Sequence, residues 1–414
     1  MPNKATQRFV NECESHLTEL CAAIYQTALL NQEKVLNAFV KNNVAARHFN
    51  GTTGYGYDDI GRDTLAAVFA DIFHTDAAIV SPHILSGTHA LSLALFALLN
   101  SGDTLLSVSG RPYDTLEKVI AGHGIGSLAD FGVNYKCVPL NDGEFDLDSI
   151  SACLDKTVKV VFIGRSRGYE WRDAIHPDSM RSVISFIKNK LPNVVVFCDN
   201  CYGEFVCDIE PSDVGADICV GSLIKNPGGG LASTGAYIVG RSDLIERVSF
   251  RLTAPSIGAE IGSYVPGYRE FYQGLFIAPH VVAGAIKGSL LISECLREMG
   301  YDVLPDRQSR ISDIITSVKL DTEQELISFV QEVQKYSPVD GYVTPEPWDM
   351  PGYNEPVIMA CGSFVQGASL ELSCDSPIRK PYIAYLQGGL TYEHVKLTLM
   401  GIIDKLNELR GQKQ

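Results

Sequence analysis

Two charged residues each follow an apolar run of the chain, and their types suggest a cofactor chemistry. Lys225 follows the run DICVGSLI (residues 217–224), and Asp199 ends the run NVVVFCD (residues 193–199). Both runs are typical of strands buried in a sheet, where a lysine is rarely placed without a chemical reason. Open α/β sheets bind ligands at the carboxyl ends of their strands. An amine and a carboxylate at that edge favour pyridoxal phosphate (PLP), which forms a Schiff base with a lysine and needs a carboxylate at its ring nitrogen.

Three small residues before an apolar helix could hold the phosphate of such a cofactor. Ser86, Gly87 and Thr88 precede the run HALSLAL (residues 89–95). Free backbone N–H groups and the positive end of a helix dipole bind anions at such a turn. The alternative is an ordinary helix N-cap. Because the segment follows the first strand of the expected sheet, we predict that it shares an edge with the charged pair, where Ser222 would add a hydroxyl group.

An aromatic ring normally covers one face of a bound pyridine ring, and two residues are candidates for this role. His89 and Tyr113 both fall within reach of the expected sheet edge, and the sequence leaves the choice between them open. Cys198 and Cys201 form a Cys-x-x-Cys pair, a spacing that also occurs in zinc and redox sites. The sequence holds no second such pair, so we expect packing cysteines and no metal.

A substrate carboxylate would be bound by an arginine, and three arginines are candidates. Arg379 lies in the segment 369–392, whereas Arg165 and Arg167 follow an apolar run. A guanidinium group binds a carboxylate through two parallel hydrogen bonds. By default a lone arginine is a solvated surface charge, and the sequence leaves the choice among the three open.

The rest of the chain supplies the elements that must position these residues. Between residues 77 and 240, apolar runs alternate with helical stretches, which is typical of a mostly parallel sheet covered by helices. We therefore predict an α/β protein with a large domain over residues 63–280. A helical arm and loop over residues 1–62 precede this domain, and a smaller α+β domain over residues 281–414 follows it.

Length, charge and cysteine content narrow the possible classes of function. The chain has 414 residues, 45% of them hydrophobic, and a net charge of -15 at pH 7. This length favours two domains that share one site, and the negative charge argues against nucleic-acid binding. The N-terminus lacks the apolar core of a signal peptide and the apolar runs are too short to span a bilayer, so we expect no membrane association. Eleven scattered cysteines fit reduced thiols, which predicts a cytoplasmic location.

In combination, these motifs resemble a known family of enzymes. The resemblance rests on SGTHAL (86–91), GYGYDDIGR (54–62), GRSRGYEWR (164–172), YLQGGLTY (385–392), the pair Asp199 and Asn200, and the Ser-x-x-Lys spacing from Ser222 to Lys225. They look like the methionine gamma-lyase-like, aluminium-resistance branch of the PLP enzymes of Cys/Met metabolism. This resemblance implies the PLP-dependent transferase-like fold type I, also called aspartate aminotransferase-like, with a mostly parallel seven-stranded sheet in the large domain.

The resemblance also implies roles for individual residues. Lys225 would be the Schiff-base lysine and Asp199 the partner of the ring nitrogen; Asn200, Gly87, Thr88 and Ser222 would complete the cofactor site. Tyr55 or Tyr57, with Arg62, is similar to residues that reach the phosphate of a neighbouring subunit. This similarity implies a homodimer or homotetramer with shared active sites. Ile224 stands where such enzymes usually carry a hydroxyl group.

The activity that the resemblance implies is cleavage of a carbon–sulfur bond. A PLP-dependent lyase of the methionine gamma-lyase or cystathionine beta-lyase type would act on a sulfur amino acid by β- or γ-elimination, releasing a 2-oxo acid, ammonia and a thiol. Transamination or aldol cleavage on the same scaffold is one alternative, because a fold does not fix the chemistry. A PLP-binding protein without turnover, serving stress or metal tolerance, is the other.

Overall fold

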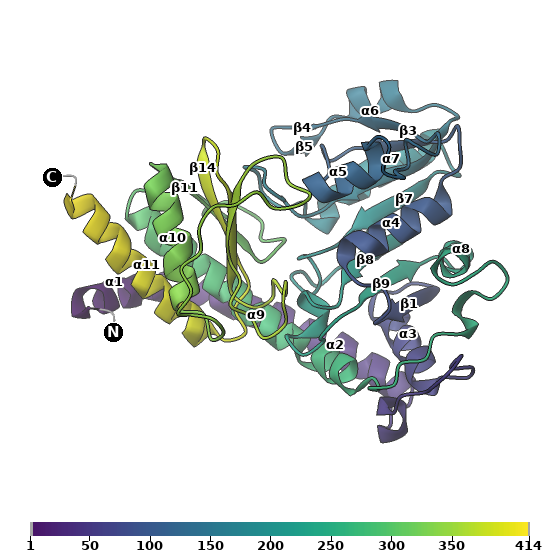
Figure 1. Cartoon of the computed structure of the whole chain (residues 1–414), viewed down its shortest axis with the longest axis horizontal. Coiled ribbons are helices and arrows are strands. Elements are labelled where there is room, and N and C mark those ends of the chain that lie inside the picture. Colours follow the sequence, from purple (N-terminus) through teal and green to yellow (C-terminus); the bar gives the residue numbers. More distant parts are fainter. Residues whose placement is uncertain (1–2, 413–414) are drawn as a thin grey trace.

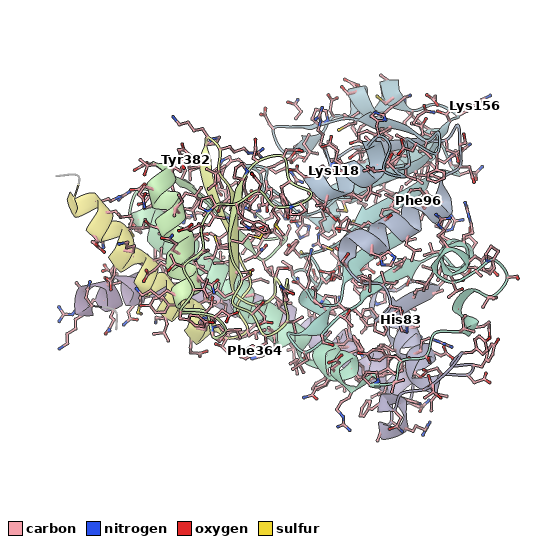
Figure 2. The ribbon with its side chains drawn as sticks, in the orientation of Figure 1. His83, Phe96, Lys118, Lys156, Phe364 and Tyr382 are labelled. Carbon is pink, nitrogen blue, oxygen red and sulfur yellow. The ribbon has the colours of Figure 1, made fainter. Side chains whose placement is uncertain are left out.

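The computed structural model describes residues 3–412, which form two domains that lie side by side, each built on its own sheet (Figure 1). The large domain contains a seven-stranded sheet and the small domain a five-stranded sheet. Phe96 marks a helix of the large domain and Tyr382 a strand of the small domain in Figure 2. The predicted site residues must therefore be located with respect to both sheets.

The large sheet has the strand order β1-β9-β8-β7-β6-β2-β3. Its strands are β1 (Ala77–Ser81), β2 (Thr104–Ser107), β3 (Asn134–Cys137), β6 (Val158–Gly164), β7 (Val195–Asp199), β8 (Ile218–Ser222) and β9 (Ala236–Gly240). A short hairpin of β4 (Leu140–Asn141) and β5 (Glu144–Phe145) lies outside it. All neighbouring strands are parallel except the two pairs that involve β9. The prediction of a mostly parallel seven-stranded sheet is confirmed.

Helices cover both faces of the large sheet. They are α3 (Ile60–Ile72), α4 (Gly87–Leu98), α5 (Asp114–Ala121), α6 (Leu147–Cys153), α7 (Pro177–Lys190) and α8 (Ser242–Leu252). Phe197 of β7 joins the hydrophobic core formed with α4, α5 and α8, whereas its neighbour Cys198 joins the core formed with α3 and α7. Successive side chains of a strand point to opposite faces, so both faces of β7 are buried. This burial explains why the central strands are apolar throughout.

The small domain is an antiparallel sheet covered by helices. Its strands are β10 (Val303–Leu304), β11 (Ile315–Leu320), β12 (Val357–Ala360), β13 (Ser373–Pro377) and β14 (Tyr382–Gln387), and its helices are α10 (Glu323–Lys335) and α11 (Tyr392–Gln412). The N-terminal arm consists of α1 (Lys4–Ser15) and α2 (Thr18–Lys41), which pack along the long helix α9 (Arg269–Glu298). Helix α9 passes through residue 281, so the predicted start of the small domain falls inside a continuous helix.

Helix α9 connects the two domains and is the most apolar long helix of the described chain. It is the single helix among residues 3–412 that is long and apolar enough to cross a membrane. However, 72% of the most apolar 18-residue stretch of this helix is buried inside the protein. Packing between the two domains therefore accounts for its composition.

The turn that follows Lys225 rests directly on the backbone of α9. A Cβ atom added at Gly274 of α9 would lie 2.1 Å from the carbonyl oxygen of Gly228, and one added at Gly229 would lie 2.2 Å from the carbonyl oxygen of Gly274. Real Cβ atoms do not approach oxygen so closely, so only glycine fits on both sides of this contact. The contact fixes the turn that carries Lys225 against a helix shared by both domains.

We predict that Gly274→Ala destabilises the protein, whereas Gly284→Ala in the same helix does not. The first substitution forces α9 and the turn apart, which costs about 1–3 kcal/mol. At Gly284 an added Cβ meets no atom within 4 Å, so alanine contributes its better helix propensity, about 0.5–1 kcal/mol. Thermal unfolding followed by fluorescence should show a lower midpoint for Gly274→Ala alone. Equal midpoints for the two variants would contradict the proposed contact.

Candidate active site

Lys225 lies in the turn after β8, at the wall of a cavity of about 670 Å³ between the two domains. Its amine lies 3.9 Å from the centre of the Tyr202 ring. Tyr202 has a φ of 71°, in the left-handed region that is uncommon for a residue with a side chain, and such strain is often found at functional sites. Burial lowers the pKa of the Lys225 amine, but the surrounding acidic groups, Asp199 among them, outweigh this effect and raise it.

Asp199 ends β7 and lines the same cavity as Lys225. In the parallel ladder it lies beside Val220 of β8, and its side chain accepts a hydrogen bond of 3.1 Å from the backbone N–H of Cys201. Its side chain is largely buried, and this burial raises the pKa of the carboxyl group, while the charge of Lys225 opposes the rise. The structure thus brings together the amine and the carboxylate that the sequence suggested.

The N-terminus of α4 forms one wall of the cavity and offers a site for an anion. Ser86, Gly87 and Thr88 line the cavity together with Ser222 from the end of β8. A Cβ atom at Gly87 would lie 3.3 Å from the sulfur of Cys201, so glycine keeps the backbone accessible at this point. The Ser86 hydroxyl accepts a hydrogen bond from the backbone N–H of His89, as in an N-cap. The remaining N–H groups of the first turn and the hydroxyl groups suit a phosphate.

The structure distinguishes between the two candidate rings. Tyr113 lines the cavity, and its hydroxyl lies 3.0 Å from that of Thr88. The His89 ring does not line the cavity, because its Nδ1 accepts a hydrogen bond from the backbone N–H of Leu85. His89 is therefore corrected to a residue that stabilises the turn before α4. Tyr113 remains the candidate for covering a bound ring.

Two further predicted site residues belong to a buried network beneath the sheet edge. Neither Asn200 nor Arg165 lines the cavity, and both are completely buried. The Arg165 guanidinium donates to the Asn200 side chain at 2.8 Å and to the carbonyl oxygen of Gly203 at 2.9 Å. The Asn200 amide in turn donates to Glu210 at 2.9 Å. The prediction of Arg165 as a substrate ligand and of Asn200 as a cofactor ligand is corrected, because their polar groups are occupied inside the protein.

Arg167 and Arg379 both line the cavity, but they differ in burial and in their ion-pair partners. Arg167 is buried and holds Asp313 through two hydrogen bonds of 3.1 and 3.2 Å. Arg379 is half-exposed and forms one ion pair of 2.9 Å with Glu355. A substrate carboxylate could replace Glu355 at the exposed pair more easily than it could replace Asp313 at the buried pair. The geometry therefore favours Arg379.

Several cavity residues from the small domain and from the loop after β6 were not among the predicted ligands. They are Tyr169, Tyr353, Asp375, Tyr385 and Gln387. The Tyr169 hydroxyl donates to Asp375 at 2.6 Å. A weak signal was present in the sequence, since two carboxylates, Glu371 and Asp375, interrupt the apolar pattern of the segment SLELSCDSP. The sequence did not show that this segment faces Lys225.

The aromatic loop before α3 lies away from this cavity within the same chain. Tyr55, Tyr57 and Arg62 do not line it. Tyr55 and Tyr57 are exposed, and Arg62 donates to the carbonyl oxygen of Gly56 at 3.0 Å and pairs with Asp63 at 2.8 Å. The prediction for these three residues concerned a neighbouring subunit, and it stays a prediction.

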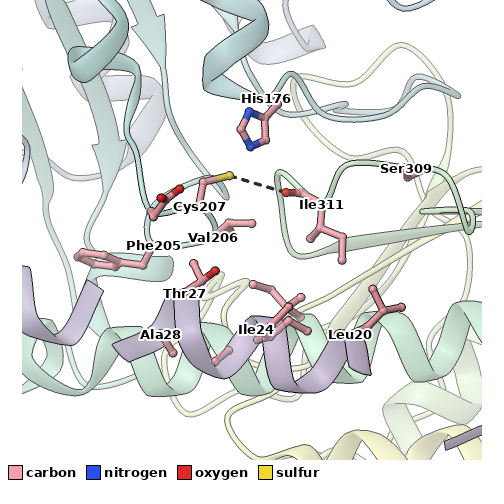
Figure 3. A pocket seen from close by; sticks show the side chains of 14 residues that line it. Leu20, Ile24, Thr27, Ala28, His176, Phe205, Val206, Cys207, Ser309 and Ile311 are labelled. Carbon is pink, nitrogen blue, oxygen red and sulfur yellow. Dashed lines mark hydrogen bonds between the residues drawn. The ribbon is translucent and has the colours of Figure 1, made fainter. Parts of the chain in front are cut away.

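A second, smaller cavity of about 270 Å³ lies between α2, α9 and loops of both domains (Figure 3). Leu20 and Ile24 of α2 face it from one side, and Cys207 and His176 lie on the other. The Cys207 thiol donates to the carbonyl oxygen of Ile311 at 3.7 Å, and burial lowers the pKa of His176 to about 4. This cavity thus offers a mostly apolar lining with one carboxylate, Asp208, and it lacks the amine and carboxylate pair of the larger one.

Comparisons with known proteins identify the family of the chain. The sequence model of the methionine gamma-lyase family matches residues 6–407. The uncharacterized protein YnbB of Bacillus subtilis is 46% identical over 399 residues, 95% of each chain. A solved structure from Listeria innocua, described as a candidate cystathionine beta-lyase involved in aluminum resistance, has 49% identity and a TM-score of 0.94, covering 96% of this chain and 98% of its own.

A more distant structure shows how widely the fold is shared. A candidate O-acetylhomoserine (thiol)-lyase from Campylobacter jejuni, solved with pyridoxyl-lysine phosphate, has 15% identity and a TM-score of 0.58 over 85% of this chain and 88% of its own. The two domains and the seven-stranded sheet are those of PLP-dependent fold type I enzymes. From the match along almost its whole length, the chain belongs to the methionine gamma-lyase family.

Proposed function

We propose that this protein is a PLP-dependent carbon–sulfur lyase that acts on a sulfur amino acid. The observation that carries the proposal is the cavity in which the Lys225 amine, the Asp199 carboxylate and the N-terminus of α4 meet. The relationship to a family of methionine gamma-lyases and to a candidate cystathionine beta-lyase supports the same class of reaction.

The residues that line the cavity fit PLP. Ser86, Gly87, Thr88 and Ser222 would hold its phosphate, Tyr113 would cover its ring, Asp199 would face its ring nitrogen and Lys225 would hold it covalently. Glycine at position 87 leaves room for the phosphate where a Cβ would crowd Cys201. When bound, PLP withdraws the electrons that remain at the substrate Cα after a proton is lost.

The chain's own residues supply binding and proton transfer. Arg379 binds the substrate carboxylate in exchange for Glu355 and so orients the Cα–H bond. The Lys225 amine removes the Cα proton as a general base. Asp199 keeps a proton on the ring nitrogen, which requires that its own carboxyl group stays ionised beside the cation. Loss of the sulfur group and uptake of one water then give a thiol, a 2-oxo acid and ammonia.

We also propose that two or more copies of the chain assemble and share their active sites. Exposed apolar side chains gather on α2, on the first half of α9 and on the nearby loops; they include Leu29, Leu36, Val40, Tyr55, Tyr57, Val265 and Phe276. An exposed apolar surface of this kind is typical of an interface between proteins.

The eleven cysteines are free, which supports the proposed cytoplasmic location.

The proposed activity predicts 2-oxo acid, ammonia and thiol from sulfur amino acids, and it predicts their dependence on Lys225. Lys225→Ala should reduce turnover by about 10²–10⁴-fold, because the general base is lost. Borohydride reduction of the PLP-loaded protein followed by peptide mapping should place the pyridoxyl group on Lys225. A label on another lysine would refute the assignment, and a requirement for an added 2-oxo acid would identify a transaminase instead.

Asp199→Asn should retain PLP but lose about 10²-fold or more in kcat, because a neutral amide cannot stabilise the positive charge on the ring nitrogen. The amide has the same shape as the carboxylate, so the backbone contact from Cys201 is preserved. Absorbance of the bound cofactor and steady-state kinetics measure the two effects separately. Turnover equal to that of the wild type would remove Asp199 from the mechanism.

A shared active site predicts complementation between two inactive variants. Mixed oligomers of Arg62→Ala and Lys225→Ala chains should be more active than either parent, because one site then receives both an intact lysine and an intact arginine. Mixing Lys225→Ala with Asp199→Asn is the matched control, since both residues line the cavity of one chain and no intact site can form. Absence of rescue in oligomers shown to be mixed would mean that Arg62 acts within its own chain.

A further inference from the structure

Asp375 of β13 is a carboxylate that faces the cavity and forms no ion pair, although the charge of Lys225 acts on it. Tyr169 donates to one of its oxygens at 2.6 Å and the Gln387 amide to the other at 3.3 Å. Among the ion pairs of the described residues, none includes Asp375. Burial raises the pKa of this carboxyl group to about 6, and the hydrogen bond from Tyr169 and the charge of Lys225 oppose the rise. At neutral pH the group is therefore mostly ionised although it is largely surrounded by protein.

Four other carboxylates line the cavity, and two of them have ion-pair partners, whereas Asp114 is partly exposed and accepts a hydrogen bond of 3.4 Å from the backbone N–H of Asn354. Glu170 pairs with Arg172 at 2.6 Å, and Glu117 pairs with Arg111 at 3.5 Å. Asp199 lies on the opposite domain, at the sheet edge where the proposed cofactor ring binds. Asp375 comes from the small domain, the side of the cavity that also contributes Arg379. It is thus placed to meet the substrate and not the cofactor.

Aromatic rings surround the same carboxylate. The Tyr169 ring lies 5.2 Å from that of Tyr385 and 6.2 Å from that of Tyr353, and all three residues line the cavity. Aromatic faces and an ionised carboxylate together form the kind of pocket that binds ammonium groups. A buried negative charge without an ion pair is costly, and a cation supplied by a ligand would reduce that cost.

We propose that Asp375, with the rings of Tyr169, Tyr353 and Tyr385, binds a positively charged group in the distal part of the substrate. Resting on the proposed lyase function, this inference names the substrate class: sulfur amino acids whose group beyond the sulfur carries an ammonium. Neutral thioethers of the same length are poorer substrates, and those with only a distal carboxylate are repelled by the negative charge of Asp375.

The test compares two substrates that differ in one group. S-(2-aminoethyl)-L-cysteine ends in an ammonium, and S-propyl-L-cysteine replaces that ammonium by a methyl group. The cofactor-loaded wild type should favour the first by about tenfold or more in kcat/KM, the value of a charged hydrogen bond to a carboxylate. Asp375→Asn should abolish most of this preference while still turning over S-propyl-L-cysteine. Glu117→Gln, which removes a different cavity carboxylate, should keep the preference.

A binding experiment keeps the inference separate from the lyase activity. L-lysine and L-2-aminoheptanoic acid have the same shapes as the two substrates but no sulfur to release, and their affinities are measured by calorimetry. Tighter binding of L-lysine to the wild type, reduced in Asp375→Asn, supports the inference even if neither thioether is cleaved, an outcome that refutes the proposed function alone. Equal affinities in the wild type overturn the inference whether or not the variant folds. An equal loss of kcat on both thioethers in the variant also overturns it, because that result indicates proton transfer or support of the fold.

Discussion

The parallel pairing of β7 with β8 is the constraint on which the rest of the site depends. The ladder places Asp199 beside Val220, so the carboxylate, the Ser222 hydroxyl and the Lys225 amine all emerge at one edge. A shift of one residue in this register would turn the Asp199 side chain to the other face of the sheet. Two residues far apart in sequence are therefore brought together by backbone hydrogen bonds, and their meeting does not require attraction between the charges.

The network under this edge joins the ends of β6 and β7 and pairs the buried acid Glu210 with Arg165. Arg165 donates its backbone N–H to the Asp199 carbonyl oxygen, while its side chain binds Asn200 and lies 3.6 Å from Glu210. Loss of one partner would leave a buried charge uncompensated, at a cost of about 3–5 kcal/mol. Burial raises the pKa of the nearby Glu204 to about 8, so this acid is mostly neutral at pH 7. Asp199, at the end of β7, is the carboxyl group at this edge that raises the pKa of the Lys225 amine.

The sequence predicts the parts of the structure that depend on local pattern. The central strands are apolar because both faces are covered, whereas the edge strand β3, with the sequence NYKC, carries no such signal and was not foreseen. Asp199 and Lys225 could be located because they directly follow central strands. Arg165 and Arg167 are two residues apart, yet one is enclosed in the network and the other reaches the cavity. That difference depends on distant partners, which a single sequence does not display.

The same limit explains why the substrate side of the cavity was harder to foresee than the cofactor side. The cofactor side is built by consecutive strands of one sheet, but Asp375 reaches the cavity only because the small domain is held against the large one. Tyr169 forms this link, since its hydroxyl binds Asp375 and its carbonyl oxygen accepts a hydrogen bond of 2.7 Å from Tyr385. A displacement of about 1 Å between reacting groups can cost a large part of the rate. On the proposed function, Tyr169 therefore sets the position of the substrate relative to Lys225, and changes in the small domain can alter specificity while the β7–β8 edge stays intact.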